Sequence, residues 1–481
     1  MDTISFATIT ELQEKLAQKK ISHEELVDYF LRRIDIFEPR IDSLLETFDK
    51  KSVLPKSAPT GSLAGIPGVI KDNICMEGRV ASCASRMLEH FVAPTDATAI
   101  KRLKSQGALL LGRANMDEFA MGSTTESSVY KKTKNPWDVT RIPGGSSGGS
   151  AAAVSAGLVP WALGSDTGGS VRQPAALCGI VGIKPTYGLI SRYGLISYAS
   201  SLDQIGVLTR SVKDNALILS AIAGQDAKDS SSLPIEQKKY AQHLDGVLPT
   251  GIKIGVLDLS IEGQGVDPEI ASAVENAIKV LENLGGTIKR IALPTFDYSA
   301  AAYFILSRAE AASNLARFDG VRYGMRNKKA TTLTQMYRST RHDGFGDEVR
   351  SRIIVGNYVL SSGHSGEFYE NAKKVQRLMR CEITDTFKNV DVIIMPTHST
   401  PAFKLGTYDA SKLQIDLQDY FTCPVNITGV PAISVPCGIT KNNLPIGFQI
   451  IGPHLSEELL YKVAYAFEHI TPWHTMRPPA F

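Results

Sequence analysis

The chain has 481 residues, of which 43% are hydrophobic and 21% charged, and its net charge is +3. This composition is typical of a globular protein with a sizeable core, and the length allows one large α/β domain or two to three ordinary ones. Without a dense run of Lys or Arg, the charge excludes a dominant nucleic-acid surface but not a local basic patch.

The first residues and the cysteines of the chain bear on the cellular compartment in which the protein is expected. The first 20 residues carry acidic side chains and no apolar stretch, which argues against a signal or transit peptide. No window approaches the ~18 consecutive apolar residues of a membrane span, so we expect no membrane partner. The 6 cysteines are scattered without a CxxC pair, which favours buried, reduced thiols in a cytoplasmic protein.

The first 200 residues predict helices followed by short strands. Residues 21–48 have apolar positions at helical spacing and contain Pro39, which predicts two amphipathic helices broken there. Residues 64–73 predict a strand and a turn, and residues 96–119 predict a helix, a glycine stop and a buried strand. Between 140 and 200 glycine and small residues dominate, with a short apolar run at 157–169 that ends in a glycine turn, and we expect short apolar strands separated by Gly and Pro at 176–191.

The second half of the chain continues the alternation of strands and helices. We expect a strand at 251–258, a helix at 267–285, mostly helical structure at 299–385, buried strands at 391–403 and 431–438, and a helix at 455–468. Such an alternation implies an α/β fold with a mixed central sheet covered by helices on both faces. Because there is no repeat or long linker, we expect a single large domain over 1–481, with a largely helical insertion at about 299–385.

Two glycine- and serine-rich segments lie close together, GGSSGGSAAAV at 144–154 and GSDTGGSVRQPA at 164–175. Neither has the lysine of a P-loop or the spacing of a dinucleotide fingerprint. A flexible loop is one interpretation, although the alanines of the first segment predict that a helix begins there. Nucleophilic catalysis is the other, because a turn at 166–170 would direct several backbone N–H groups at one point, as an oxyanion requires.

A serine nucleophile needs a base. None of the 9 histidines lies in the glycine-rich region, and no GxSxG elbow surrounds Ser170. Lys71 follows an apolar run, and burial there would lower the pKa of its ammonium group toward neutrality and make it a usable base. A surface lysine, or one paired with Asp72, is the alternative interpretation.

Together these residues resemble the amidase signature family, whose members use a Ser–cis-Ser–Lys triad. The parts occur in the family's order, with Lys71 in KDN, Ser146 in GGSSGGS and Ser170 in GSDTGGS. The resemblance implies the amidase signature fold, Ser170 as the nucleophile that forms the acyl-enzyme, and Ser146 as the bridge to Lys71. It also implies a cis peptide bond between Gly145 and Ser146.

The resemblance assigns roles to the rest of the two segments as well. It implies an oxyanion hole made by the backbone amides of Thr167, Gly168 and Gly169. We expect the other serines to serve packing and loop hydrogen bonds: Ser147, Ser150 and Ser165.

Within the family, the chain is similar over almost its whole length to glutamine-hydrolysing members that supply ammonia for the amidation of misacylated tRNA. RFDGVRYG (317–324), GFGDEVRSRIIVGNYVLSSG (344–363) and PVNITGVPAISVPCG (424–438) carry this likeness. It implies that Arg352 and Asp419 hold the α-carboxylate and α-ammonium of glutamine, and that Tyr303 lines the pocket. A free amino acid does need one cation and one anion for recognition, although a surface position on an Arg-rich helix is the alternative for Arg352.

The same resemblance implies partners. The chain would form a heterotrimer with the B and C subunits of an amidotransferase, and ammonia would pass to the B subunit. There ATP and Mg²⁺ would activate Glu-tRNA(Gln) or Asp-tRNA(Asn), and the misacylated tRNA would bind mainly to that partner. The chain itself is then expected to need no metal or nucleotide, in agreement with its lack of a P-loop and of Cys/His clusters.

Two other functions remain open. One is a stand-alone amidase that hydrolyses another amide, against which the charged pair Arg352 and Asp419 argues. The other is a non-catalytic scaffold, against which the intact Lys71, Ser146 and Ser170 argue.

Overall fold

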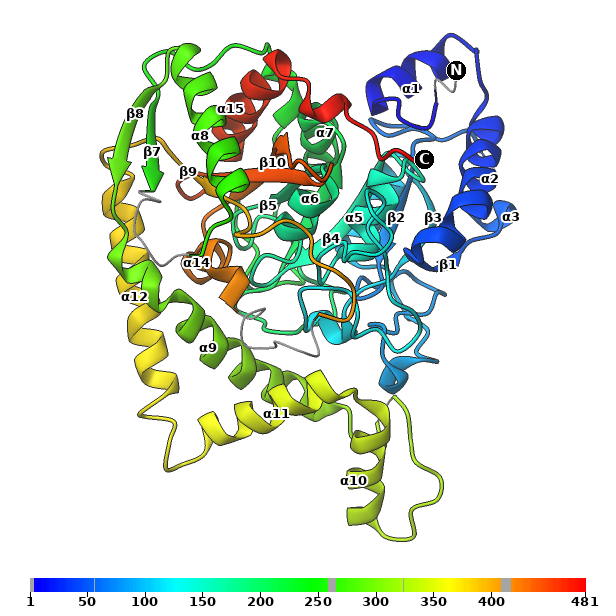
Figure 1. Cartoon of the computed structure of the whole chain (residues 1–481). Helices are drawn as coiled ribbons and strands as arrows, with labels where there is room; N and C mark the ends of the chain where they lie inside the picture. Colours follow the sequence, from blue (N-terminus) through cyan, green and yellow to red (C-terminus); the bar gives the residue numbers. More distant parts are fainter. Residues whose placement is uncertain (1–3, 56, 258–264, 323, 408–416) are drawn as a thin grey trace.

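The computed structural model describes residues 4–55, 57–257, 265–322, 324–407 and 417–481. Within them a single sheet of 11 strands crosses the molecule in the order β1-β3-β2-β4-β6-β5-β10-β11-β9-β7-β8 (Figure 1). The strands are β1 (Leu44–Thr47), β2 (Pro67–Lys71), β3 (Leu109–Ala114), β4 (Trp161–Asp166), β5 (Val181–Lys184), β6 (Gln204–Thr209), β7 (Lys253–Leu257), β8 (Thr287–Ile291), β9 (Val392–Pro396), β10 (Ala432–Ile439) and β11 (Pro445–Ile451).

The sheet is mixed, as the sequence predicted. β2 pairs in parallel with β3 and β4, and β7 pairs in parallel with β8 and β9, whereas the strands between these groups are antiparallel. Residues that follow parallel strands meet at the same edge of a sheet. The ends of β2 and β4 therefore bring Lys71 and Asp166 to one edge.

Helices cover both faces of this sheet. Adjacent residues of a strand point to opposite faces. A Cβ on Gly447 of β11 would lie 2.8 Å from Ala176, whereas Gly438, which pairs with Ile446 on the other face, would place its Cβ 3.0 Å from Ala273. Since Ala176 belongs to α6 and Ala273 to α8, these two helices lie on opposite faces. The α/β fold with both faces covered is confirmed.

The helices of the described chain range from one turn to five. They are α1 (Ile9–Ala17), α2 (His23–Ile41), α3 (Lys50–Val53), α4 (Thr98–Ser105), α5 (Gly148–Ser155), α6 (Arg172–Cys178), α7 (Val212–Ile222), α8 (Pro268–Asn283), α9 (Ser299–Asn314), α10 (Leu333–Gly344), α11 (Asp347–Leu360), α12 (Tyr369–Thr386), α14 (Cys423–Thr428) and α15 (Glu457–Ile470), with short 3₁₀ turns that include η1 (Arg86–Leu88), η2 (Glu118–Ala120) and η7 (Leu417–Phe421). None of the helices described is long and apolar enough to cross a membrane.

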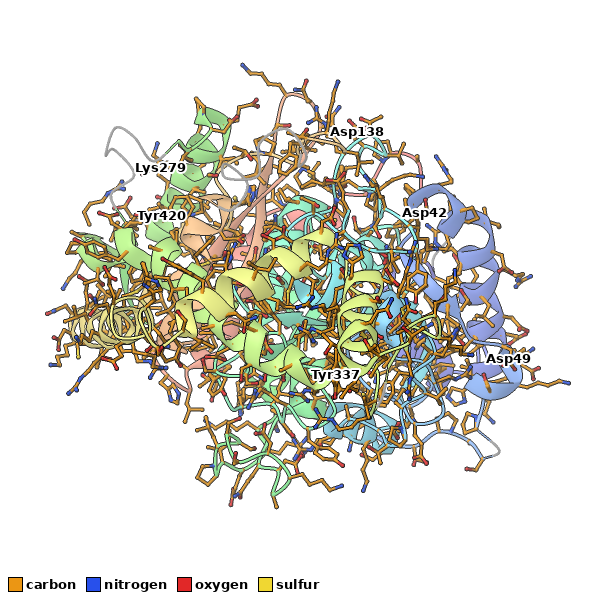
Figure 2. The ribbon with its side chains drawn as sticks, turned by 90° about the horizontal axis from the view of Figure 1, so that it is seen from below. Asp42, Asp49, Asp138, Lys279, Tyr337 and Tyr420 are labelled. Carbon is orange, nitrogen blue, oxygen red and sulfur yellow. The ribbon has the colours of Figure 1, made fainter. Side chains whose placement is uncertain are left out.

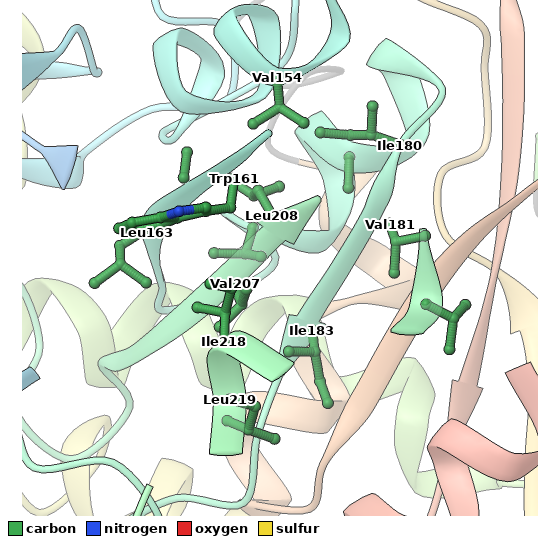
Figure 3. Close-up of a cluster of buried hydrophobic side chains, with 14 of the residues drawn as sticks. Val154, Trp161, Leu163, Ile180, Val181, Ile183, Val207, Leu208, Ile218 and Leu219 are labelled. Atoms are coloured by element: carbon green, nitrogen blue, oxygen red, sulfur yellow. The ribbon is translucent and has the colours of Figure 1, made fainter. Parts of the chain in front are cut away.

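Trp161 is the largest fully buried side chain of the core (Figure 3). It lies on β4 and belongs to the same hydrophobic core cluster as Val154, Leu163, Val207 and Leu208. Its ring fits because the neighbouring β2 carries Gly68, where a Cβ would lie 2.1 Å from a ring carbon. This glycine is thus explained by packing and not by backbone conformation.

Helices α9 to α12 lie together along one side of the molecule, and α10 projects from its lower end (Figure 1). The described residues between Ser299 and Thr386 contain no strand. That this region is an insertion into one domain over 1–481 stays a prediction.

Several elements differ from the sequence-based expectation. The segment 21–48 forms one helix and a strand, not two helices, because Pro39 fits into the last turn of α2. The residue that caps the end of this helix, Asp42, adopts the left-handed conformation. Helix α6 (Arg172–Cys178) extends three residues into 176–191, where short strands were expected. The apolar pattern did not single out β1, β6, β8, β11 and α7.

We expect Gly68→Ala to destabilise the fold by roughly 1–3 kcal/mol, the usual effect of overpacking a core. The added methyl group would clash with the ring of Trp161, which has no room to move. Urea unfolding of the two proteins measures the effect. Gly363→Ala is the matched control, since a Cβ there meets nothing within 4 Å, and equal destabilisation by both changes would contradict the packing argument.

Candidate active site

Lys71 is the last residue of β2 and is fully buried between β3 and β4. Its Nζ lies 2.8 Å from the Oγ of Ser146 and 2.9 Å from the Oγ atoms of both Ser147 and Ser165. No carboxylate among the described residues forms an ion pair with it. Three neutral hydroxyl groups, with the carbonyl of Ser165 at 3.3 Å, therefore satisfy the hydrogen bonding of this buried nitrogen.

The environment of Lys71 shifts its proton equilibrium. Burial lowers the pKa of Lys71 to about 7, although the negative charges of Asp117, Asp166 and Asp203 act in the opposite direction. About half of the lysine side chains are then neutral near pH 7, which is the condition for a general base.

The two alternative interpretations of Lys71 are wrong. The side chain is not at the surface. Its neighbour Asp72 bonds instead to the guanidinium of Arg113 on β3 and to the hydroxyl of Ser82.

The loop before α5 brings Ser146 to the lysine by close approach of its backbone. The peptide bond between Gly145 and Ser146 is cis. A Cβ on Gly145 would lie 2.1 Å from Oδ2 of Asp117, and one on Gly144, where φ is +85°, would lie 2.6 Å from Oε1 of Gln173. Larger side chains are excluded at both positions, so the glycines are required by packing and by backbone conformation.

Ser170 lies in the turn between β4 and α6 and is 8% exposed. Its carbonyl accepts a hydrogen bond of 3.1 Å from the amide of Ser147, which joins the two glycine-rich segments. Within the described residues no hydrogen bond connects the hydroxyls of Ser170 and Ser146. Of a relay from Ser170 through Ser146 to Lys71, only the second contact is formed in this structure.

A buried ion pair holds the turn that carries Ser170. Oδ1 of Asp166 lies 3.0 Å from Nη2 of Arg172, and neither side chain is exposed. Burial alone would raise the pKa of Asp166, but the charge of Arg172 and the hydrogen bonds to the carboxylate hold it at about 2. The same carboxylate accepts the amide of Gly169 at 2.8 Å, so the ion pair also orients the turn.

The three amides that the resemblance assigned to an oxyanion hole are not equivalent. The amide of Gly169 is already bonded to Asp166, because a buried carboxylate needs donors. In the part of the chain that is described, the amides of Thr167 and Gly168 make no hydrogen bond. A Cβ on Gly168 would lie 2.5 Å from Cζ of Tyr303, so the tyrosine ring lies directly against this turn.

A cavity of about 500 Å³ opens at the turn and brings together four of the residues that the sequence singled out, Ser170, Tyr303, Arg352 and Asp419. This volume is in the range of small-molecule sites, about 300–1,000 Å³. The remaining wall comes mainly from α9, α11 and the loop after η2: Ala120, Gly122, Ser123, Ala300, Ala301, Phe304, Ile305, Arg308, Val355, Tyr358, Val359 and Phe368.

Two of the three charged residues that line the cavity, Arg352 and Asp419, are held by contacts within the chain. Nε of Arg352 lies 2.6 Å from Oε1 of Glu348, and its Nη1 lies 2.6 Å from the hydroxyl of Tyr198. Arg352 is buried, so a surface position is the wrong interpretation. The hydroxyl of Ser123 donates to Oδ2 of Asp419 over 3.1 Å.

Some residues of the site were missed or given another part in the sequence analysis. All three serines expected to serve packing and loop hydrogen bonds make such bonds, Ser150 to the carbonyl of Leu163 and Ser147 to that of Ser165, but Ser147 and Ser165 also contact Lys71. A signal for Ser165 existed, since it lies one residue before the end of a strand parallel to β2. Nothing in the sequence pointed to Ser123. The described residues contain no cluster of three or more His, Cys, Asp and Glu that could hold a metal ion.

We expect Lys71→Met to increase the free energy of unfolding by an amount that depends on pH. The pKa of this lysine is 10.5 in a model peptide and about 7 in the fold, so between these values the unfolded chain binds the extra proton. Lys71 therefore destabilises the native state most below about pH 7, and the penalty shrinks as the pH rises toward 10.5. The gain from Met should be larger at about pH 6 than at about pH 9.5, by on the order of 2–3 kcal/mol.

Urea unfolding at both pH values measures this difference. Lys101→Met, at an exposed position on α4, is the control and should show no such pH dependence. Equal gains from Lys71→Met at both pH values would contradict the lowered pKa.

Comparison with known proteins agrees with this geometry. The family model described as Amidase matches residues 25–461. The A subunit of glutamyl-tRNA(Gln) amidotransferase from Picosynechococcus sp. is 48% identical, covering 98% of this chain and 99% of that protein. The A subunit of the same enzyme from Halothermothrix orenii is 49% identical over 98% of both chains.

Among solved structures, the crystal structure of the A subunit of glutamyl-tRNA(Gln) amidotransferase from Thermotoga maritima superposes with a TM-score of 0.83 at 40% identity, covering 99% of this chain and 97% of that one. The fold, the arrangement of the lysine and the two serine segments, and these full-length similarities lead to one conclusion. The chain belongs to the amidase signature family.

Proposed function

We propose that this chain is the glutamine-hydrolysing subunit of a tRNA-dependent amidotransferase. It releases ammonia from the side-chain amide of glutamine, and a partner chain uses that ammonia to convert Glu-tRNA(Gln) or Asp-tRNA(Asn) to the correctly amidated form. One observation carries the proposal. The buried contact between Lys71 and Ser146 lies beside a cavity that Ser170, Arg352 and Asp419 share.

The first step is acyl transfer to Ser170. Neutral Lys71 takes the proton of Ser146 as Ser146 takes that of Ser170. The missing contact between the two serines is expected to form when substrate binds, since catalytic hydrogen bonds often tighten only then. The oxygen of Ser170 bonds to the amide carbon, and the amides of Thr167 and Gly168 stabilise the oxyanion. As the carbon–nitrogen bond breaks, the proton returns to the leaving nitrogen and ammonia departs.

The second step hydrolyses the ester. Water attacks the glutamyl carbon, and its proton passes to Lys71 along the same path. The carbon–oxygen bond then breaks, Ser170 regains its proton, and glutamate leaves. Both steps need the lysine neutral at the start, which its lowered pKa provides.

Recognition of glutamine follows from the charges of the cavity. The α-carboxylate approaches Arg352 and the α-ammonium approaches Asp419, while the ring of Tyr303 lies between the cavity and the turn at Gly168. Charge-assisted hydrogen bonds of this kind are stronger than neutral ones. Because Glu348 and Ser123 hold the two charged groups in place, little ordering is needed on binding.

The proposal assigns the remaining chemistry to partners. The matched relatives are named as parts of an amidotransferase, and we infer a heterotrimer with the B and C subunits in the cytoplasm. The B subunit would use ATP and Mg²⁺ and hold most of the misacylated tRNA. This chain would need no cofactor of its own.

The two alternative functions explain less of the site. A stand-alone amidase for apolar amides would leave the charges of Arg352 and Asp419 facing a substrate that cannot bond to them. A scaffold would have no use for a lysine kept neutral by burial against three hydroxyl groups.

Ser170→Ala should abolish glutamine-dependent amidation in the assembled complex and leave ammonia-dependent amidation unchanged. The reason is that Ser170 makes only the ammonia, which free ammonium salt can replace. Both rates are measured as formation of Gln-tRNA(Gln). Ser150→Ala, which removes a buried hydroxyl that faces a carbonyl on β4, is the control and should keep both activities. Failure of ammonium to rescue Ser170→Ala would refute the division of labour.

Asp419→Asn should raise the KM for glutamine about ten- to a hundred-fold, as expected for losing a hydrogen bond to a charged group worth ~1.5–3 kcal/mol. The kcat should change little, because the contact is equal in the ground and transition states. Kinetics with glutamine and with an analogue lacking the α-amino group separate recognition from chemistry.

Ser123→Ala is the matched control for this change, since it removes the hydrogen bond to Asp419 but keeps the charge. It should have a smaller effect on KM than Asp419→Asn. If the des-amino analogue suffers as much as glutamine, Asp419 is structural and does not recognise the ammonium.

A further inference from the structure

One segment of the helical region has a charge unlike that of the rest of the chain. Residues 317–344 contain seven Lys or Arg and two Asp, a net charge of +5, whereas the whole chain has +3. The remainder is therefore net negative. We call the described part of this segment, residues 317–322 and 324–344, the basic lobe.

The basic lobe is a folded element attached to the body. It comprises α10 and the turn before it, and it projects from the lower end of the molecule (Figure 1). Figure 2 looks at this end, with Tyr337 of α10 labelled. The amide of Met325 donates to the backbone carbonyl of Met87 over 2.7 Å, and Gly344 lies against the side chain of Met87. Met336 of α10 is buried. The lobe is therefore packed against the body of the protein, and its charged side chains extend from a folded element.

Four of the seven cations of the lobe are available to a partner. Its two carboxylates are already bonded within the lobe, Asp319 to Arg322 at 3.2 Å and Asp343 to the amide group of Asn327 at 2.7 Å. Four exposed cations form no ion pair with any residue that the structure describes: Arg326, Lys328, Lys329 and Arg338.

We propose that the basic lobe binds the phosphate backbone of the tRNA that the assembly amidates. The inference rests on the proposed function, which brings a tRNA to the complex. Lys and Arg contacts to phosphates provide affinity and orientation without reading sequence. The lobe lies on the chain immediately before α11, whose residue Arg352 lines the cavity, so a tRNA held there stays attached to the chain that makes the ammonia.

An acidic protein surface is a different occupant, and the observations favour RNA over it. Lysine is depleted at the centres of protein–protein interfaces. Here two adjacent lysines and two arginines of the lobe are exposed, and both carboxylates of the lobe are already bonded within it, as a polyanion requires.

The test uses the assembled complex and a tRNA transcript labelled with a fluorophore. The lobe variant carries Arg326→Gln, Lys328→Gln, Lys329→Gln and Arg338→Gln. Its matched control carries four changes that remove the same charge from exposed positions on other elements: Lys20→Gln, Lys51→Gln, Lys101→Gln and Lys279→Gln. Fluorescence anisotropy at salt concentrations from about 50 to 200 mM gives the affinity and its salt dependence.

We expect the lobe variant to bind tRNA about 10- to 100-fold more weakly at the lowest salt. The slope of log Kd against log salt should fall by about 1 for each phosphate that the variant no longer neutralises, up to about 4. The control variant should bind as the native complex does. Ammonia release from glutamine should be unchanged in both variants, since none of these residues lines the cavity.

An unchanged affinity and slope in the lobe variant would overturn the proposal. So would dissociation of the partner chains from the lobe variant with tRNA binding retained, which would identify the lobe as a protein interface. If the quadruple variant does not fold, two double variants replace it: Lys328→Gln with Lys329→Gln, and Arg326→Gln with Arg338→Gln. Each should show about half of the predicted change in slope. A native complex that releases no ammonia from glutamine would refute the proposed function, and the tRNA titration would still decide the role of the lobe.

Discussion

The rest of the site depends on the burial of Lys71. An ammonium group removed from water must be paired with a charge, hydrogen-bonded, or neutral. A carboxylate in contact with the ammonium group would have kept Lys71 charged, and Lys71 could then not act as a base. Three hydroxyl groups instead satisfy its hydrogen bonds without a charge, while burial lowers its pKa to about 7. Three hydroxyls can meet at one nitrogen only if their backbones approach closely, which explains why serine and glycine dominate the two segments.

A second buried charge connects this arrangement to distant parts of the chain. Arg172, paired with Asp166, also contacts Gln449 of β11 at 2.9 Å and Asn426 of α14 at 2.6 Å. The turn that carries Ser170 is therefore held by residues more than 250 positions later. Breaking such a pair by removing one partner typically costs about 3–5 kcal/mol. The position of Ser170 consequently depends on the whole sheet being assembled, not on its own segment alone.

The sequence predicted the parts of the site whose cause is local or carried by a motif. The apolar run and the strand end revealed Lys71, and the glycine-rich segments revealed Ser146 and Ser170. Contacts between distant residues could not be predicted in this way. That Ser147 and Ser165 reach Lys71 depends on the parallel pairing of β2 with β4, which no single segment encodes.

The strands and helices, like the site residues, were predicted where their cause is local to one segment. Strands in apolar runs, such as β2, β3 and β7, were predicted, whereas β1 and β8 were not. Residues 287–291 are half exposed and lack a continuous apolar pattern, and β1 exists only because it pairs with β3. The prediction of a helix break at Pro39 was wrong for a physical reason. A proline removes one hydrogen bond and crowds the preceding turn, but near the end of α2 the helix had few further bonds to lose.

The position of Arg352 in the cavity wall is fixed by a contact between two helices and not by the sheet. A Cβ on Gly356 of α11 would lie 2.0 Å from the carbonyl oxygen of Arg308 on α9, so the two helices touch at their backbones. Residues four positions apart lie one turn apart on a helix, and this contact therefore sets the position of Arg352 along the cavity wall. Tyr303 stands on the opposite helix against Gly168. The helix pair thus carries Arg352 and Tyr303, whereas Asp419 lies on η7, and Lys71 and Ser165 lie at the ends of β2 and β4. Side chains of the wall can consequently change, and with them the choice of amide, without exposing the buried lysine to water.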